Sequence, residues 1–148
     1  VGVIATERSL QGEKFLSTLA RYGEGVEVIK SVGRGFVEAV EADAESEEST
    51  KSLVRDIVES IIEAGADVIV LGCTHYPFLR PLIEQVIGEK DIEVIDSGEA
   101  VARRVKWLME RYDIAADGTK HPEYRFLSFA DEEYRQRLEQ CAMHIIEE

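Results

Sequence analysis

The sequence has few cysteines, few basic residues and no long apolar run. Its 148 residues include two cysteines in unlike surroundings, Cys73 at the end of an apolar run and Cys141 in a polar C-terminal segment. A disulfide framework is therefore not indicated, and we expect a free thiol at Cys73. No stretch approaches the roughly 18 apolar residues of a membrane-spanning helix, and the first residues do not read as a signal peptide. We expect a cytoplasmic protein.

Basic residues are outnumbered by acidic ones, 17 against 30, which gives a formal net charge of -13. This charge would repel a phosphate backbone, and no cluster of Lys and Arg interrupts it. The composition therefore argues against nucleic acid and anionic membrane surfaces as partners. His121 and His144 offer no ligand spacing with each other, so we expect no metal site.

Apolar runs alternate with helical patterns along the chain, whose length fits one domain. We expect strands at 1–6, 26–29, 67–71, 92–95 and 124–129, and helices at 7–21, 49–64, 77–87, 99–112 and 131–146. The acidic stretch 41–48 is expected to be a solvated connection, and Pro81 predicts a restarted first turn in its helix. This alternation predicts parallel βαβ units, hence an α/β fold with an open parallel sheet in a three-layer sandwich.

The string Leu71-Gly-Cys-Thr-His-Tyr-Pro77 follows the predicted strand 67–71 and leads into a helix. It places a thiol, a hydroxyl and an imidazole at the carboxyl end of a parallel strand, where ligands bind in open α/β sheets. By the same topology, Thr6 and the pair Asp96-Ser97 follow other strands. We therefore expect these groups to share one edge of the sheet.

Most of the candidate site residues allow both a functional and a purely structural interpretation. A free cysteine has a pKa of about 8.5 and a helix N-terminus or a cation can raise its thiolate fraction, so Cys73 could be a base or a nucleophile. It could also be a buried small hydrophobe. His75 could donate a proton to the group that Cys73 handles, or be a loop residue bonded to the backbone, while Thr74 could be a helix cap. From its context alone, Glu41 begins the solvated acidic run.

The string 71–77, with Leu79-Arg-Pro-Leu-Ile83 and Ile95-Asp-Ser97, closely resembles the second half of bacterial glutamate racemases, in the aspartate/glutamate racemase family. The start, Gly2-Val-Ile-Ala-Thr6, is more weakly similar. The resemblance implies one of two pseudo-symmetric α/β halves that face each other across a cleft. It also implies that two cysteines, one from each half, act as acid and base on opposite faces of the substrate α-carbon, without a cofactor.

Carried over by position, Cys73 is the second acid/base, and Thr74 with His75 would bind glutamate and assist the thiol. Glu41 falls where the family has a supporting acidic residue. Chain segment 32–35 stands where the family commonly has a Cys-Pro pair. The family's other half has an Asp-Ser-Gly-rich turn after its first strand and an Ala-Cys-Asn-Thr-like string. No such turn follows the first predicted strand of this sequence, and the string is absent from it. The chain therefore reads as a C-terminal portion, inactive alone, of an enzyme that supplies D-glutamate for peptidoglycan.

On this reading, residues 1–112 form the second α/β half with the Cys-Thr-His site. Residues 113–148 supply a strand and a helix that would pack on the missing N-terminal half. The tail helix carries apolar side chains near helical spacing, at Tyr134, Leu138, Ala142 and Ile145, which predicts a homo-oligomer. Two alternatives stay open: a racemase of aspartate or another small acidic substrate, and a non-catalytic binding module in which Cys73 is structural.

Overall fold

A computed structural model describes residues 1–119 and 121–147. The chain divides into two units, Val1–Lys106 and Trp107–Glu148, which we describe separately. The division falls within one helix, Gly98–Tyr112. Among the described residues, none of the helices combines the length and the apolar character needed to cross a membrane.

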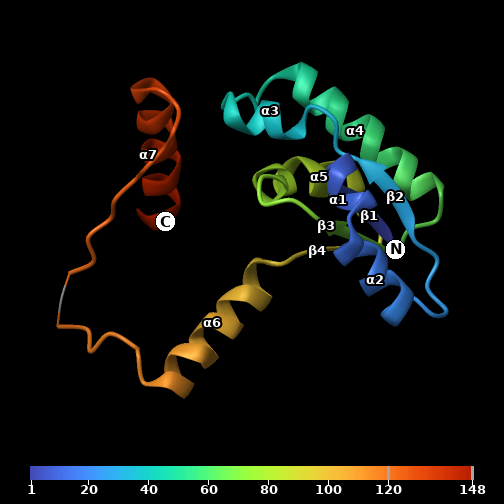
Figure 1. The fold of residues 1–148 in the computed structure, drawn as a ribbon. Helices are drawn as coiled ribbons and strands as arrows, with labels where there is room; N and C mark the ends of the chain where they lie inside the picture. Colours follow the sequence, from blue (N-terminus) through green and yellow to red (C-terminus); the bar gives the residue numbers. More distant parts are fainter. Residues whose placement is uncertain (120, 148) are drawn as a thin grey trace. The chain divides into compact units, whose positions relative to one another are not determined.

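Unit 1 is built on a four-stranded parallel sheet. Its strands are β1 (Gly2–Ala5), β2 (Ile29–Val32), β3 (Val68–Leu71) and β4 (Glu93–Asp96), in the order β2-β1-β3-β4 (Figure 1). Gly2 of the central strand pairs with Ile29 of β2 and with Ile69 of β3. Because all strands point the same way, their carboxyl ends lie along one edge.

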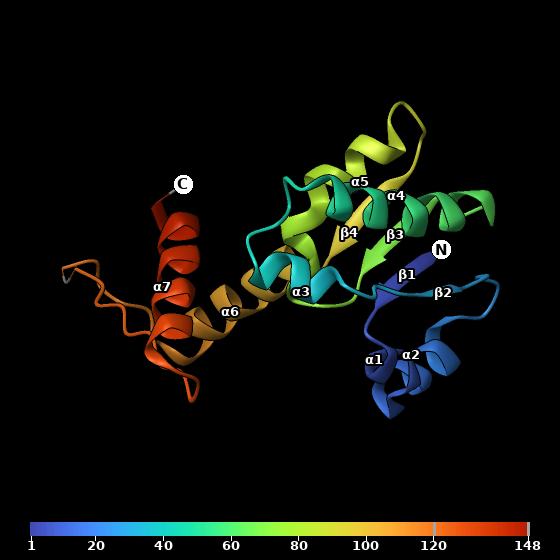
Figure 2. The ribbon, with the colours of Figure 1, turned by 90° about the horizontal axis from the view of Figure 1, so that it is seen from above.

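Helices cover both faces of the sheet (Figure 2). One face carries α1 (Glu7–Gln11) and α2 (Glu13–Tyr22), and the other carries α3 (Phe36–Glu41), α4 (Glu48–Glu63), the 3-10 turn η1 (Tyr76–Leu79) and α5 (Arg80–Ile87). After β4 the chain enters α6 (Gly98–Tyr112). These layers confirm the α/β sandwich predicted from the alternation of apolar runs.

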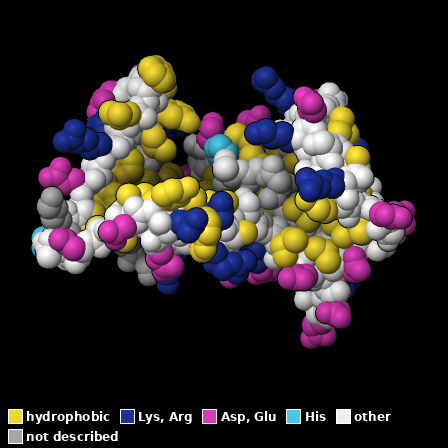
Figure 3. Space-filling view, turned by 60° about the horizontal axis from the view of Figure 1, so that its bottom comes forward, with side chains coloured by type: hydrophobic (Ala, Val, Ile, Leu, Met, Phe, Trp, Pro, Cys, Tyr) yellow, Lys and Arg dark blue, Asp and Glu magenta, His cyan; other side chains and the backbone are white. Residues whose placement is uncertain are grey.

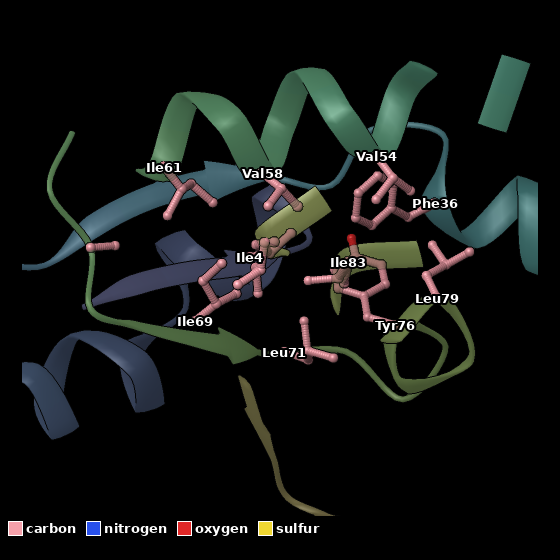
Figure 4. Packing of buried hydrophobic residues seen from close by; sticks show 12 residues of the cluster. Ile4, Phe36, Val54, Val58, Ile61, Ile69, Leu71, Tyr76, Leu79 and Ile83 are labelled. Atoms are coloured by element: carbon pink, nitrogen blue, oxygen red, sulfur yellow. The ribbon is translucent and has the colours of Figure 1, made fainter. Parts of the chain in front are cut away.

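The core lies mainly between the sheet and α4 and α5 (Figure 4). Successive side chains of a strand point to opposite faces. Ile4 and Ile69 therefore pack against Val58 of α4 and Ile83 of α5, and all four are fully buried. Val3 and Ala5 of β1 face the other way, toward Leu10 of α1. This packing fixes the sheet edge on which the site is built.

Two local expectations for unit 1 were wrong, and one helix, α3, falls where no element was predicted. The second strand is Ile29–Val32 rather than 26–29, because the ladder begins where Ile29 finds its β1 partners after the turn at Gly25, which has a φ of 77°. The helix expected at 7–21 is divided at Gly12, whose extended backbone ends α1 and begins α2. The apolar segment after Gly35 forms helix α3. The restart predicted at Pro81 is confirmed, because α5 begins after η1.

Unit 2 contains the end of α6 and α7 (Glu132–Glu147), which confirms the predicted tail helix. The strand expected at 124–129 is absent from the described residues, where the backbone is irregular. A segment with alternating aromatic side chains forms a strand only if a neighbouring strand pairs with the backbone of that segment. Leu127, Phe129, Tyr134 and Leu138 are exposed. Figure 3 shows hydrophobic side chains, in yellow, on one face of the molecule. The side chain of Ile145 lies outside the described set.

Candidate active site

The candidate site lies at the carboxyl edge of the sheet. Ile4 of β1 pairs with Leu71 of β3, and Leu71 pairs with Asp96 of β4. The residues that follow these strands therefore meet at one edge, as predicted. Thr6 caps α1 there, and its hydroxyl oxygen accepts a hydrogen bond from the Ser9 amide at 3.2 Å.

Gly72 lets the loop after β3 approach the central strand. Its amide donates to the carbonyl of Ile4 at 2.8 Å. A Cβ at this position would come within 2.9 Å of the Ala5 Cβ, so a larger residue would push the loop away. The Tyr76 amide then donates to the Cys73 carbonyl at 3.2 Å. These two hydrogen bonds hold Cys73 in a tight turn directly after the strand.

The side chains of Cys73, His75 and Glu41 lie in a row. Cys73 Sγ is 4.0 Å from His75 Nδ1, and His75 Nε2 is 3.4 Å from Glu41 Oε1. Cys73 is a partly buried free thiol, and the side chains of His75 and Glu41 are 35% and 43% exposed. The structure thus brings Glu41, 32 positions before Cys73 in the sequence, within ion-pair distance of the imidazole. Its local context had favoured a solvated residue.

Cys73 and Thr74 also line an open groove of about 680 Å³ beside α2. The other lining residues come from α2, β3, Gly72 and the end of β4: Lys14, Phe15, Thr18, Val70, Leu71, Gly72, Ile95, Asp96 and Ser97. Thr74 is exposed and free to meet a bound molecule. The ammonium group of Lys14 adds a positive charge to the lining of the groove. A small polar molecule in the groove would therefore lie near a thiol, hydroxyl groups, an ammonium group and the carboxylate of Asp96.

Tyr76 anchors the site loop to the segment Gly33–Phe36, where α3 begins. The sequence pattern did not predict this role. Its buried hydroxyl donates to the carbonyl of Gly33 at 3.1 Å, and its ring meets the ring of Phe36 edge-on with centroids 5.2 Å apart. Burial, with smaller contributions from Cys73 and Glu38, raises the pKa of Tyr76 to about 12, so it stays a hydrogen-bond donor at neutral pH. The feature of the sequence that could have indicated this role is that Tyr76 directly follows His75.

Asp96 joins β4 to two helices. Its Oδ1 accepts from the Gly98 amide at 2.7 Å at the start of α6, and its Oδ2 accepts from Arg80 Nη2 at 2.9 Å. The Gly98 amide first, and then Arg80, hold the pKa of Asp96 below its usual range. The sequence pattern had placed Asp96 at this edge but had not identified Arg80 as its partner. In the part of the chain that the structure describes, no three His, Cys, Asp or Glu side chains are grouped to hold a metal ion.

Comparisons with known proteins identify the family of this chain. A family model for Asp/Glu/hydantoin racemases matches residues 1–105. The glutamate racemase of Herpetosiphon aurantiacus is 39% identical over 141 residues, which are 95% of this chain and 55% of that protein. The chain spans about half the length of the curated relatives it matches.

Solved structures show the same fold. Glutamate racemase isoform RacE1 from Bacillus anthracis superposes with a TM-score of 0.81 at 24% identity, over 97% of this chain and 53% of that one. Escherichia coli glutamate racemase, solved in complex with L-glutamate and the activator UDP-MurNAc-ala, gives a TM-score of 0.71 at 25% identity, over 95% of this chain and 53% of that one. The described fold is therefore about half of a known larger one.

Proposed function

The chain belongs to the Asp/Glu/hydantoin racemase family, and we propose that it is the C-terminal part of a glutamate racemase in which Cys73 is one of two acid/base groups. The observation that carries this proposal is the row formed by Cys73, His75 and Glu41 at the sheet edge. Inversion of a stereocentre by proton transfer needs one group to remove the α-proton and another, on the opposite face, to return one. Cys73 would serve one face.

His75 and Glu41 would assist the thiol. A carboxylate beside an imidazole favours the protonated imidazole, and a cation beside a cysteine favours the thiolate, which is the form that can accept a proton. The distances of 3.4 Å between Glu41 and His75 and of 4.0 Å between His75 and Cys73 support a role in which Glu41 acts on His75 and His75 acts on Cys73. When Cys73 acts as an acid in the reverse direction, the same imidazole would stabilise the thiolate that remains.

Glutamate is the substrate that the relatives support, since the aligned relatives are glutamate racemases and the E. coli protein was solved with L-glutamate. In the groove beside Cys73, the Thr74 hydroxyl and the Lys14 ammonium group could bind carboxylate oxygens. We assign the second acid/base to a cysteine of the complementary N-terminal half. By family, the parent would work in the cytoplasm and supply D-glutamate for peptidoglycan.

The test replaces Cys73 with Ser in the full-length enzyme that contains this chain. A serine hydroxyl has nearly the shape of the thiol but is a far weaker acid. We expect net racemisation to fall by at least about 10² to 10⁴-fold, because a positioned acid/base contributes that much. Glutamate binding should be largely retained.

Solvent deuterium exchange at the α-carbon separates the two faces. The Cys73→Ser variant should lose exchange for one enantiomer only, and Cys141→Ser, the matched control, should exchange both. Exchange of both enantiomers at near-normal rates by Cys73→Ser would show that Cys73 is not an acid/base.

A further inference from the structure

Helix α3 carries Glu41 to the site, but α3 is too short to hold a position by itself. It has six residues, fewer than an isolated helix needs to be stable in water. Its first residue, Phe36, is fully buried, while Glu41 at its last position is 43% exposed. The position of Glu41 therefore depends on how α3 packs on the core, through Phe36 at its beginning and through the partly buried Val37 and Val40.

The beginning of α3 is held by Tyr76. The carbonyl of Gly33 accepts hydrogen bonds from the Tyr76 hydroxyl at 3.1 Å and from the Phe36 amide at 3.3 Å. The Phe36 ring meets the Tyr76 ring edge-on at 77°. One buried side chain thus satisfies the carbonyl that precedes α3 and packs against the first residue of α3.

Gly33 fits this contact closely. A Cβ at position 33 would lie 2.6 Å from the Tyr76 hydroxyl oxygen and 2.7 Å from Cζ, inside contact distance. Tyr76 is itself fully buried, so its ring has little freedom to move aside. The glycine and the tyrosine are therefore complementary to each other, one supplying the space that the other fills.

Tyr76 also follows His75 directly in the sequence, so a single residue anchors both partners of the Glu41–His75 pair. We propose that Tyr76 is a positioning residue that holds Glu41 opposite His75 through its hydrogen bond to Gly33. This inference rests on the proposed function, because it takes the Glu41–His75–Cys73 row as the working arrangement. Titratable groups near Tyr76 and His75 in the described structure include Cys73 of the site loop and Glu38 and Glu41 of α3.

The test measures the alkylation rate of Cys73 by iodoacetamide in the 148-residue chain, with mass spectrometry to separate Cys73 from Cys141. The variants are Tyr76→Phe, Glu41→Gln and the double variant, each followed across pH 5 to 9. Phe keeps the ring that packs on Phe36 and removes only the hydroxyl. Tyr22→Phe, at an exposed tyrosine of α2, is the matched control.

We expect Tyr76→Phe and Glu41→Gln each to slow Cys73 alkylation at neutral pH by about two- to fivefold, the range of a partly exposed ion pair. The two variants should shift the pH profile in the same direction. If Tyr76 acts through Glu41, the double variant should be no slower than the slower single variant. Tyr22→Phe should react like the unmodified chain.

Gly33→Ala provides a second variant if Tyr76→Phe fails to fold, which circular dichroism would show. Because the buried Tyr76 ring has little freedom to move, the added methyl group should push the backbone of residue 33, and with it the carbonyl that accepts the hydrogen bond, away from the hydroxyl. This variant should therefore slow alkylation to a similar extent. Additive effects in the double variant, or a normal rate in Tyr76→Phe beside a slow Glu41→Gln, would overturn the positioning role and leave the proposed function standing. If Glu41→Gln and His75→Gln both leave the rate unchanged, the assisting row itself fails.

Discussion

Asp96 offers a pH-dependent test of the site's framework. Replacing it with Asn keeps the shape of the side chain and the acceptor for the Gly98 amide, but removes the charge that Arg80 meets at 2.9 Å. The side chain of Asp96 is 19% exposed and that of Arg80 is 35% exposed. Solvent therefore screens the pair in part, and we expect Asp96→Asn to lower the free energy of unfolding by about 1 kcal/mol at pH 7.

The sign of the pH dependence follows from the pKa of Asp96, which folding lowers from its ordinary value of 3.8. A carboxyl group with a lowered pKa in the folded state adds stability above its unfolded pKa. That stability is lost as the pH falls through the folded pKa. The destabilisation caused by Asp96→Asn should therefore be full at pH 7 and should shrink below about pH 4.

Urea unfolding of the 148-residue chain at pH 7 and at pH 3 measures both values. Glu84→Gln is the matched control, because Glu84 also pairs with Arg80, at 3.4 Å, but is 54% exposed. We expect the control to change stability by only a few tenths of a kcal/mol. An equal loss at both pH values for Asp96→Asn would refute the argument, since the effect would then not come from the charge.

Three further outcomes are expected. Cys73 should be alkylated faster than Cys141 in the native chain, although Cys141 is the more exposed thiol, because Cys73 lies beside the His75 imidazole. Mass spectrometry of the two cysteine-containing peptides measures both rates. Faster alkylation of Cys141 would count against an activated thiol at Cys73. Ile83→Ala should lower the free energy of unfolding by about 2 to 5 kcal/mol in urea titrations, because it leaves a cavity in the main core. Sedimentation at high concentration should show dimers or larger species through apolar side chains such as Tyr134 and Leu138, and a strictly monomeric chain would contradict this.

Elements with a strong apolar pattern could be predicted from the sequence. Helix α4 lies within one residue of its predicted bounds because its apolar stripe, with Val54 and Val58, faces the sheet. The strand Val68–Leu71 was equally clear, because a strand covered on both faces is apolar throughout. Parallel strands share a carboxyl edge by topology. The position of the Cys-Thr-His string at that edge could therefore be predicted from the order of the elements alone.

Elements that depend on partners could not be predicted in this way. The start of β2 is set by its pairing with β1, and residues 124–129 have a strand-like pattern but no strand in the described structure. Glu41 lies in an acidic run that reads as solvated, and only the folding of α3 against the site loop brings it to His75. That packing depends on Tyr76 and Gly33, which are 43 positions apart. A local sequence pattern cannot predict a contact, such as that between Tyr76 and Gly33, whose partners are so far apart in the sequence.

The arrangement of the site also explains why this chain would need a partner to racemise an amino acid. Cys73, His75 and Glu41 stand in one row on one sheet edge, so they can reach a bound α-carbon from one side only. Residues 1–106 contain no other cysteine. Moving a proton to the opposite face needs a second group on that face, because the two positions lie on opposite sides of a tetrahedral carbon. In the proposed enzyme, the substrate would therefore bind between Cys73 and an acid/base group of the N-terminal half, and that second group would serve the opposite face of the α-carbon.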